Sequence, residues 1–251
     1  MNTAFYPGFD GAGLALHRIG AGRPLILLHG LFSSAEMNWI KFGQAELLAE
    51  AGFECLMPDL RAHGHSAAPH DPAAYPDDVL AKDLAALVDH LGLADYELCG
   101  FSLGARTAVR GVIAGLKPQR LVLGGMGLEG LAGWTARGAF FIDAIDRFDE
   151  VQTGDPAFHA VQFMKTMKVD RTAVRMLLQT FADTPPEALS VITMPTLVVN
   201  GDADRDNGDP AALTAVLPDA VQVIVPGTHM SCVTKPDLGI AIRDFLQPGS
   251  I

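Results

Sequence analysis

Residues 96–108 read YELCGFSLGARTA and carry the strongest local signal of the chain. An apolar run ends in Gly100-Phe101-Ser102-Leu103-Gly104, after which the spacing predicts a helix over residues 103–114. A serine between a strand and a helix needs a strained backbone on a tight turn, and flanking glycines remove the side chains that would collide there. We therefore interpret Ser102 as a candidate nucleophile, with a plain helix cap as the alternative.

Short apolar runs alternate with longer amphipathic stretches on both sides of this turn. The predicted strands are residues 25–28, 53–57, 96–99, 121–123, 196–199 and 221–225. The predicted helices are residues 39–51, 76–91, 103–114, 210–216 and 238–246. This alternation is typical of an α/β fold, in which helices cover both faces of a mostly parallel sheet.

Residues 128–190 interrupt the alternation, because they contain no convincing strand. They collect seven of the chain's Phe and Trp residues, namely Trp134, Phe140, Phe141, Phe148, Phe158, Phe163 and Phe181. We predict a core of residues 1–127 and 191–251 and a helical cap over residues 128–190, since long insertions in compact domains often serve as lids. Additional helices that merely pack on the core are the alternative. If the segment is a cap, it would line an apolar acyl pocket.

The composition limits the choice of partners and compartment. Hydrophobic residues make up 49% of the 251, enough for a sizeable core, and 29 acidic against 18 basic residues give a net charge of -11. We expect neither nucleic acid nor a membrane as a partner. The three cysteines, Cys55, Cys99 and Cys232, lie in or beside apolar runs and predict buried free thiols. We expect a cytoplasmic protein, monomeric or homodimeric.

A serine hydroxyl needs a base to take its proton and a third group to orient that base. The strand predicted at 196–199 runs into NGDAD at 200–204, and the strand predicted at 221–225 runs into PGTH at 226–229. Strand ends in an open parallel sheet share one edge, so Ser102, an aspartate near 202–204 and His229 would converge. Serine, aspartate and histidine in this chain order form one of the known triad arrangements.

An oxyanion hole would complete such a site, because the tetrahedral intermediate of acyl transfer carries a negative oxygen. We expect one donor to be the N–H of Leu103, at the start of the helix after the nucleophile. The other would be the N–H of Leu31, in the turn His29-Gly30-Leu31-Phe32 that follows an early strand. For His29 we favour a structural role, in which its side chain pins this turn by hydrogen bonds.

Five short motifs occur in a recognisable order along the chain. They are HG at 29–30, DLRAHGHS at 59–66, GFSLG at 100–104, GDAD at 201–204 and PGTH at 226–229. Together they resemble the α/β-hydrolase fold superfamily, in its esterase-like branch with a serine nucleophile and a cap. The resemblance implies Ser102 as nucleophile, Asp204 as acid and His229 as base, with no cofactor. We expect the substrate to be bound by Phe32, Phe101, Trp134 and Phe140.

The chain departs from the family pattern in several places. Ala62 replaces a common glycine, and the unusual residues between Asp204 and Pro210 leave Asp202 and Asp206 as rival acids. Phe32 occupies the position of a proline that is common in the family's epoxide hydrolases and dehalogenases. Those enzymes also use aspartate where this chain has a serine. The sequence therefore argues against both epoxide hydrolase and dehalogenase activity.

The resemblance implies a serine hydrolase that cleaves a small or medium apolar carboxylic ester through an acyl-enzyme. The alternatives are a hydrolase of carbon-carbon bonds in diketone-type compounds, a cofactor-free perhydrolase and a non-catalytic binding protein or receptor on the same fold. A zinc site formed by His63, His65, His70, Asp59 and Asp71 is a weak rival, because these residues lack the tight spacing of binuclear hydrolases. We expect no metal.

Overall fold

The computed structural model describes residues 2–247. The strands of these residues are β1 Asn2–Pro7, β2 Gly13–Gly20, β3 Arg23–Leu28, β4 Phe53–Pro58, β5 Glu97–Phe101, β6 Leu121–Gly124, β7 Thr196–Gly201 and β8 Ala220–Val225. They form one sheet in the order β1-β2-β4-β3-β5-β6-β7-β8. β2 pairs antiparallel with β1 and with β4, whereas the other pairings are parallel.

The predicted α/β fold class is confirmed, and each of the six predicted strands overlaps an observed strand, with the one predicted at residues 96–99 beginning one residue before β5. The hairpin of β1 and β2 was not predicted. In β2 the apolar run is short and is followed by His17, which reads as a polar interruption. His17 is nevertheless only 3% exposed, and its Nε2 lies 3.2 Å from a carboxylate oxygen of Asp59, which satisfies the buried ring. That contact depends on a residue far along the chain, so local sequence does not reveal it.

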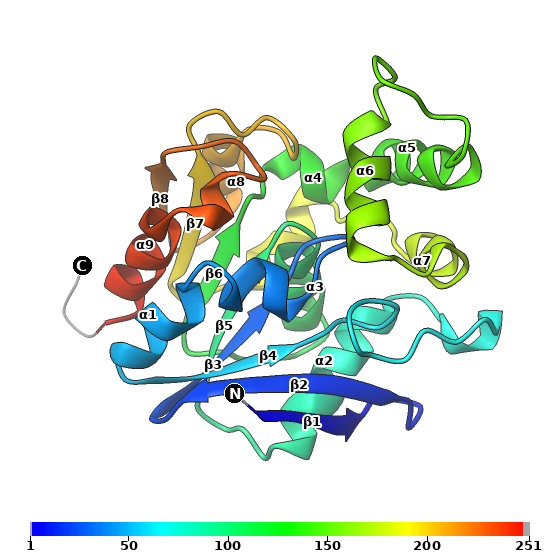
Figure 1. Cartoon of the computed structure of the whole chain (residues 1–251). Coiled ribbons are helices and arrows are strands. Elements are labelled where there is room, and N and C mark those ends of the chain that lie inside the picture. Colours follow the sequence, from blue (N-terminus) through cyan, green and yellow to red (C-terminus); the bar gives the residue numbers. More distant parts are fainter. Residues whose placement is uncertain (1, 248–251) are drawn as a thin grey trace.

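Helices cover both faces of the sheet (Figure 1). One face packs α1 Gln44–Glu50 and α9 Pro236–Leu246, and the other packs α2 Val79–His90, α3 Leu103–Ile113 and α8 Pro210–Val216. Alternate residues of β3 point to opposite cores, with Leu25 and Leu27 in one and Ile26 and Leu28 in the other. Burial on both faces explains why β3 is apolar from Leu25 to Leu28.

The helix predicted over residues 39–51 is divided in two. A π-helical turn, η1 Glu36–Ile40, precedes α1, and Gly43 between them has φ of 78°. This left-handed backbone breaks the helical hydrogen-bond pattern and is accessible to glycine at little cost. The remaining predicted helices are confirmed with small shifts at their ends.

Residues 128–190, which we call the helical insertion, hold α4 Leu128–Ala132, α5 Trp134–Asp146, α6 Phe158–Met167 and α7 Arg171–Leu178, followed by the 3-10 turn η3 Pro186–Val191. Helices α5, α6 and α7 group together to one side of the sheet (Figure 1). Apolar side chains of the insertion join the same core as α2 and α3. Among residues 2–247, every helix falls short of the length and apolar character that a membrane span needs.

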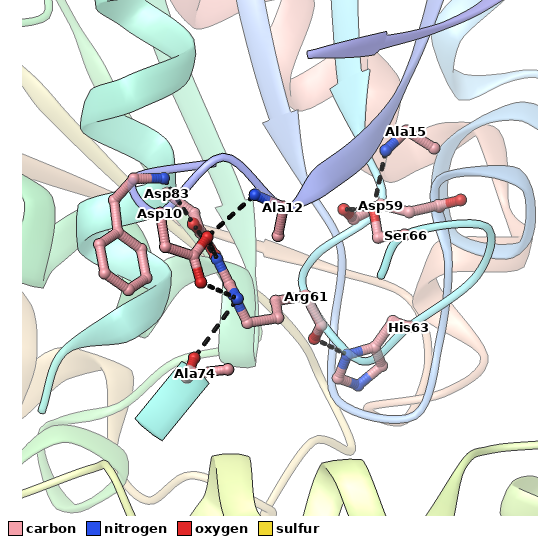
Figure 2. Close-up of polar contacts among 10 residues, drawn as sticks. Asp10, Ala12, Ala15, Asp59, Arg61, His63, Ser66, Ala74 and Asp83 are labelled. Atoms are coloured by element: carbon pink, nitrogen blue, oxygen red, sulfur yellow. Dashed lines mark hydrogen bonds and ion pairs between the residues drawn. The ribbon is translucent and has the colours of Figure 1, made fainter. Parts of the chain in front are cut away.

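The loop after β4 is fixed by a buried guanidinium (Figure 2). The Arg61 side chain is fully buried and donates at 2.8 Å to carboxylate oxygens of both Asp83 and Asp10. It also donates at 3.3 Å to the carbonyl of Ala74. Because two carboxylates compensate this charge, the residue ties the turn before β2, the loop after β4 and α2 together.

The predicted thiols and polar clusters are also placed by the structure. Cys55, Cys99 and Cys232 are buried and free, as predicted. Within residues 2–247, no group of three or more His, Cys, Asp or Glu side chains is arranged to hold a metal ion. Asp59 instead accepts hydrogen bonds from the backbone N–H groups of Ala35 and His65, at 2.9 Å each.

Candidate active site

Ser102 lies on a strained turn between β5 and α3, with φ of 53° and ψ of -111°. Positive φ is costly for a residue with a side chain, so the surroundings must enforce it. The enforcing contacts involve the two glycines of the motif. A Cβ on Gly100 would lie 2.2 Å from the carbonyl of Gly104, and a Cβ on Gly104 would lie 2.2 Å from the carbonyl oxygen of Leu28. Neither position can therefore carry a side chain.

Asp204 and His229 meet at the carboxyl ends of β7 and β8. His229 Nδ1 donates to Asp204 Oδ2 at 2.9 Å, and both side chains are nearly buried. Burial by itself raises the pKa of Asp204. The hydrogen bond and charge of His229, together with the backbone N–H of Asp206, outweigh burial, so the pKa of Asp204 lies below its usual value. A carboxylate at Nδ1 leaves Nε2 as the ring nitrogen that can accept a proton.

The two rival aspartates have other positions. Asp202 is exposed and accepts from the backbone N–H of Gly227 at 2.8 Å, which holds the turn after β8. Asp206 contributes its backbone N–H to Asp204 Oδ1 at 3.0 Å. Of these three aspartates, only Asp204 is hydrogen-bonded to His229 among the described residues.

The Ser102 hydroxyl has an unexpected neighbour. Asn207 Nδ2 lies 3.5 Å from Ser102 Oγ and donates to the carbonyl of Gly125 at 2.7 Å. Among residues 2–247, Ser102 Oγ makes no hydrogen bond with His229, although the His229 ring lies beside Gly125 and 5.0 Å from the Phe101 ring centroid. Catalytic hydrogen bonds are often long or unaligned before substrate binds, so this geometry is compatible with a triad.

The turn after β3 approaches Ser102 closely. A Cβ on Gly30 would lie 3.5 Å from Ser102 Cβ, and the Gly30 N–H donates to Asn38 Oδ1 at 3.0 Å. The buried His29 donates from Nδ1 to the Gly30 carbonyl at 2.8 Å and accepts at Nε2 from Leu60 N–H at 2.9 Å. His29 thus forms the pinning contacts that we predicted for it. Leu31 and Leu103, the expected oxyanion donors, line one cavity together with Ser102.

A second buried histidine supports the same turn. His63 accepts at Nε2 from the N–H of Phe32, which has a left-handed φ of 61°, and its Nδ1 donates to the carbonyl of Arg61. Burial lowers the pKa of His63 to about 3 and also lowers the pKa of His29. Both imidazoles are therefore neutral structural groups. Ala62, at the family's glycine position, also has positive φ, at 66°.

The cavity beside Ser102 has a volume of about 30 Å³. Its lining residues are Leu31, Ser102, Leu103, Arg106, Met126, Gly130, Trp134, Arg137, Phe141 and Asn207. Trp134, Arg137 and Phe141 share one face of α5 because they are three and four residues apart. Phe140 lies on another side of that helix and is 40% exposed.

The structure does not bring the four expected substrate-binding residues together. Trp134 lines the cavity beside Ser102, and Phe101 packs against His229. Phe32 contacts Phe141 at 5.6 Å between ring centroids but lines a different cavity, of about 100 Å³, together with His63. Phe140 lines neither cavity.

Sequence reasoning missed three polar residues of the cavity, namely Asn207, Arg106 and Arg137. Asn207 carries no signal, since asparagine is common in turns. Arg106 does carry one, because it lies one helical turn after Ser102 among small residues, Gly104, Ala105 and Ala108. In the structure its side chain is only 3% exposed, which is rare for arginine. Arg137 could be found only by assigning it to the α5 face that carries Trp134 and Phe141.

Comparisons with known proteins agree with this geometry. The sequence pattern described as "alpha/beta hydrolase fold" matches residues 23–120. A non-heme haloperoxidase from Rhodococcus erythropolis is 27% identical, over 93% of this chain and 95% of its own length. An epoxide hydrolase from Caballeronia sordidicola is 32% identical over 43% of this chain. The chain spans between 30% and 59% of the length of three curated relatives, this epoxide hydrolase among them.

Solved structures extend the likeness to nearly the whole chain. A thermophilic esterase from Thermogutta terrifontis superposes with a TM-score of 0.72, at 23% identity, over 98% of both chains. This identity shows a common fold and no more. The strand order, the strand-to-helix turn at Ser102 and the matched sequence pattern agree, and the chain has the α/β-hydrolase fold.

Proposed function

We propose that this protein is a serine hydrolase that cleaves a carboxylic ester through an acyl-enzyme on Ser102. One observation carries the proposal: Ser102 occupies the strained turn at the sheet edge where Asp204 already holds His229 through a 2.9 Å hydrogen bond. A hydroxyl on such a turn, an oriented imidazole and a buried carboxylate are the parts that nucleophilic acyl transfer needs.

The reaction proceeds in two steps. Ser102 Oγ attacks the ester carbonyl while His229 Nε2 takes the hydroxyl proton, and Asp204 stabilises the imidazolium. The N–H groups of Leu31 and Leu103 donate to the oxyanion, and the positive end of the α3 dipole adds to this stabilisation. The ester bond then breaks, and the alcohol leaves with the proton from His229. In the second step a water molecule, deprotonated by His229, attacks the acyl-enzyme and releases the carboxylic acid and Ser102.

The helical insertion serves as a cap in this proposal. Its α5 face presents Trp134 and Phe141 to the cavity beside Ser102, and the cavity measures only about 30 Å³ with the insertion in place. Closure of that kind excludes water, which strengthens the hydrogen bonds to the developing oxyanion. The insertion would have to open for a larger substrate to enter, as lids over active sites commonly do.

A fluorophosphonate probe tests the nucleophile. We expect it to label wild-type protein and to leave both Ser102→Ala and heat-denatured wild type unlabelled. Ser102→Ala should lower kcat for 4-nitrophenyl butanoate by several powers of ten, roughly the loss known for serine nucleophiles. Turnover at the wild-type level in Ser102→Ala would overturn the proposal.

A substrate panel separates the proposed reaction from its rivals. The haloperoxidase likeness makes perhydrolysis the second candidate, since it extends over 93% of the chain. Purified protein should be assayed with esters of graded acyl length, with diketones, and with hydrogen peroxide plus a carboxylic acid. Ester cleavage faster than the other two reactions supports the proposal, whereas a faster peroxide-dependent reaction would replace it.

A further inference from the structure

We propose that the cavity beside Ser102 binds a carboxylate carried by the substrate, and that Arg137 is the residue that binds it. The inference rests on the proposed function, since it assigns a substrate class to the same cavity. It replaces the purely apolar ester suggested by the composition of the insertion with an ester that also bears an anionic group.

Arg137 is only partly satisfied by the protein. Its Nε is buried and has no hydrogen-bond partner among the described residues, while Nη1 donates to the carbonyl of Asp206. The guanidinium carbon lies 5.6 Å from the ring centroid of Phe141. A buried donor without a partner is costly, and the fork of a guanidinium matches the two oxygens of a carboxylate. A bound carboxylate would supply the missing acceptor.

Arg106 adds a second cation to the same cavity. It is buried, and its guanidinium lies 5.0 Å from the ring centroid of Trp134. Nη1 donates to the carbonyls of Gly130 at 3.4 Å and Leu131 at 3.2 Å, and Nη2 bonds the carbonyl of Ala182. Burial lowers the pKa of Arg106 to about 10, so it remains charged at neutral pH. Neutral carbonyls satisfy its donors without cancelling its charge.

The absence of carboxylate partners distinguishes these two residues from most arginines of the chain. Within residues 2–247, neither Arg106 nor Arg137 has a carboxylate oxygen within salt-bridge distance. The insertion's other arginines, Arg147, Arg171 and Arg175, each pair with an aspartate. In a protein of net charge -11, two unpaired guanidiniums in one cavity create a local positive potential.

Among the residues that the structure describes, no acidic side chain lines the cavity to oppose this potential. The charges of Asp204 and Asp206, in the loop after β7, favour the charged form of Arg137. The Asp204 carboxylate, however, is hydrogen-bonded to His229. The remaining described lining is largely apolar, and its volume of about 30 Å³ leaves room for few atoms. We therefore expect a carboxylate close to the scissile bond, as in half-esters of short dicarboxylic acids.

The test compares two esters that differ only in charge. They are 4-nitrophenyl hemiglutarate, which is anionic, and methyl 4-nitrophenyl glutarate, in which the carboxylate is masked. Arg137→Met should lower the ratio of their kcat/KM values by about 10- to 100-fold, the worth of one charged hydrogen bond pair. Arg137→Lys should retain part of the preference, because it keeps the charge and loses the fork.

A matched control and a second substrate pair sharpen the result. Arg175→Met also removes one cation from the insertion but lies outside the cavity, in an exposed pair with Asp146, so it should leave the ratio unchanged. A second pair, 4-carboxyphenyl butanoate and its methyl ester, places the anion on the leaving group. The pair that loses its preference in Arg137→Met identifies the side of the ester that Arg137 binds.

Binding of glutarate provides a readout without turnover. Titration calorimetry should detect glutarate binding to wild type and to Ser102→Ala, and at least about 10-fold weaker binding to Arg137→Met. Binding that persists in Arg137→Met overturns the inference. So does a loss of activity that is equal for the two esters in both pairs, because Arg137 would then only anchor α5 to the loop after β7.

The failure of the inference differs from the failure of the proposed function. If fluorophosphonate labels Ser102 and esters are cleaved without any charge preference, the hydrolase stands and the carboxylate site falls. If glutarate binding depends on Arg137 while Ser102→Ala retains full turnover, the anion site stands and the serine mechanism falls.

Discussion

The carboxyl edge of the sheet and the helical insertion meet at Ser102, yet they are stabilised in different ways. At the sheet edge His29, His63 and Arg61 are buried, and each bonds to groups of neighbouring loops. In the insertion the comparable contacts are exposed pairs such as Arg147 with Asp143 and Arg175 with Asp146.

This contrast has a functional meaning. Buried hydrogen bonds are costly to break, because the separated groups cannot regain water, so they fix the sheet edge in one geometry. Exposed ion pairs contribute little, so the insertion depends on its apolar packing. A rigid edge suits groups that perform chemistry. We expect the side chains of the insertion that line the cavity to tolerate replacement without displacing those groups.

The largest expected effect concerns the acid at the sheet edge. Asp204→Asn should lower kcat by up to about four powers of ten, because His229 would lose the partner that selects its tautomer. Asp202→Asn should have a much smaller effect, since Asp202 is exposed and accepts from Gly227 N–H rather than from His229. Steady-state kinetics with 4-nitrophenyl butanoate compare the two, and a greater loss in Asp202→Asn would assign the acid to that residue.

The next effect is a pH-dependent loss of stability at the same edge. Burial lowers the pKa values of His29 and His63, the latter to about 3, whereas in the unfolded chain both take up protons near pH ~6.5. Below that pH the unfolded state binds more protons than the folded state, so the free energy of unfolding falls as pH falls. The slope should reach about 2.7 kcal/mol per pH unit at most, about 1.4 from each histidine.

Urea denaturation at pH 7.5 and pH 5.5 measures this slope. His63→Gln should show roughly half of it, because one of the two titrating groups is gone. The free energy of unfolding of that variant at pH 7.5 does not affect the comparison, since only the difference between pH 7.5 and pH 5.5 is compared. A wild-type free energy of unfolding that is the same at both pH values would contradict buried, neutral histidines.

The smallest expected effect lies in the insertion. Arg175→Met removes an exposed pair with Asp146 and should change the free energy of unfolding by less than about 1 kcal/mol. The variant should also keep the wild-type kcat for neutral esters. Urea denaturation at neutral pH checks the first expectation, and a loss of several kcal/mol would mean that the insertion depends on its surface pairs after all.

Much of the sheet edge could be predicted because its signals are local. Gly100 and Gly104 lie two residues on either side of Ser102, and a Cβ on Gly100 would clash with Gly104 itself, so part of the steric demand of the turn is local. Strands buried on both faces must be apolar throughout, which reveals where each one ends. Sequence could not separate Asp202 from Asp204, since both follow the same strand and only the fold shows which carboxylate meets His229.

The sequence by itself determined the α/β order of elements, the strand-to-helix turn and the strand ends that carry Asp204 and His229. Only the tertiary structure decided which face of α5 looks onto Ser102, and hence that Phe141 and Arg137 line the cavity while Phe140 does not. The reason is physical: a turn is constrained by adjacent residues, whereas a cavity forms where distant segments pack. Asn207 and Ser102, 105 residues apart, become neighbours only through that packing.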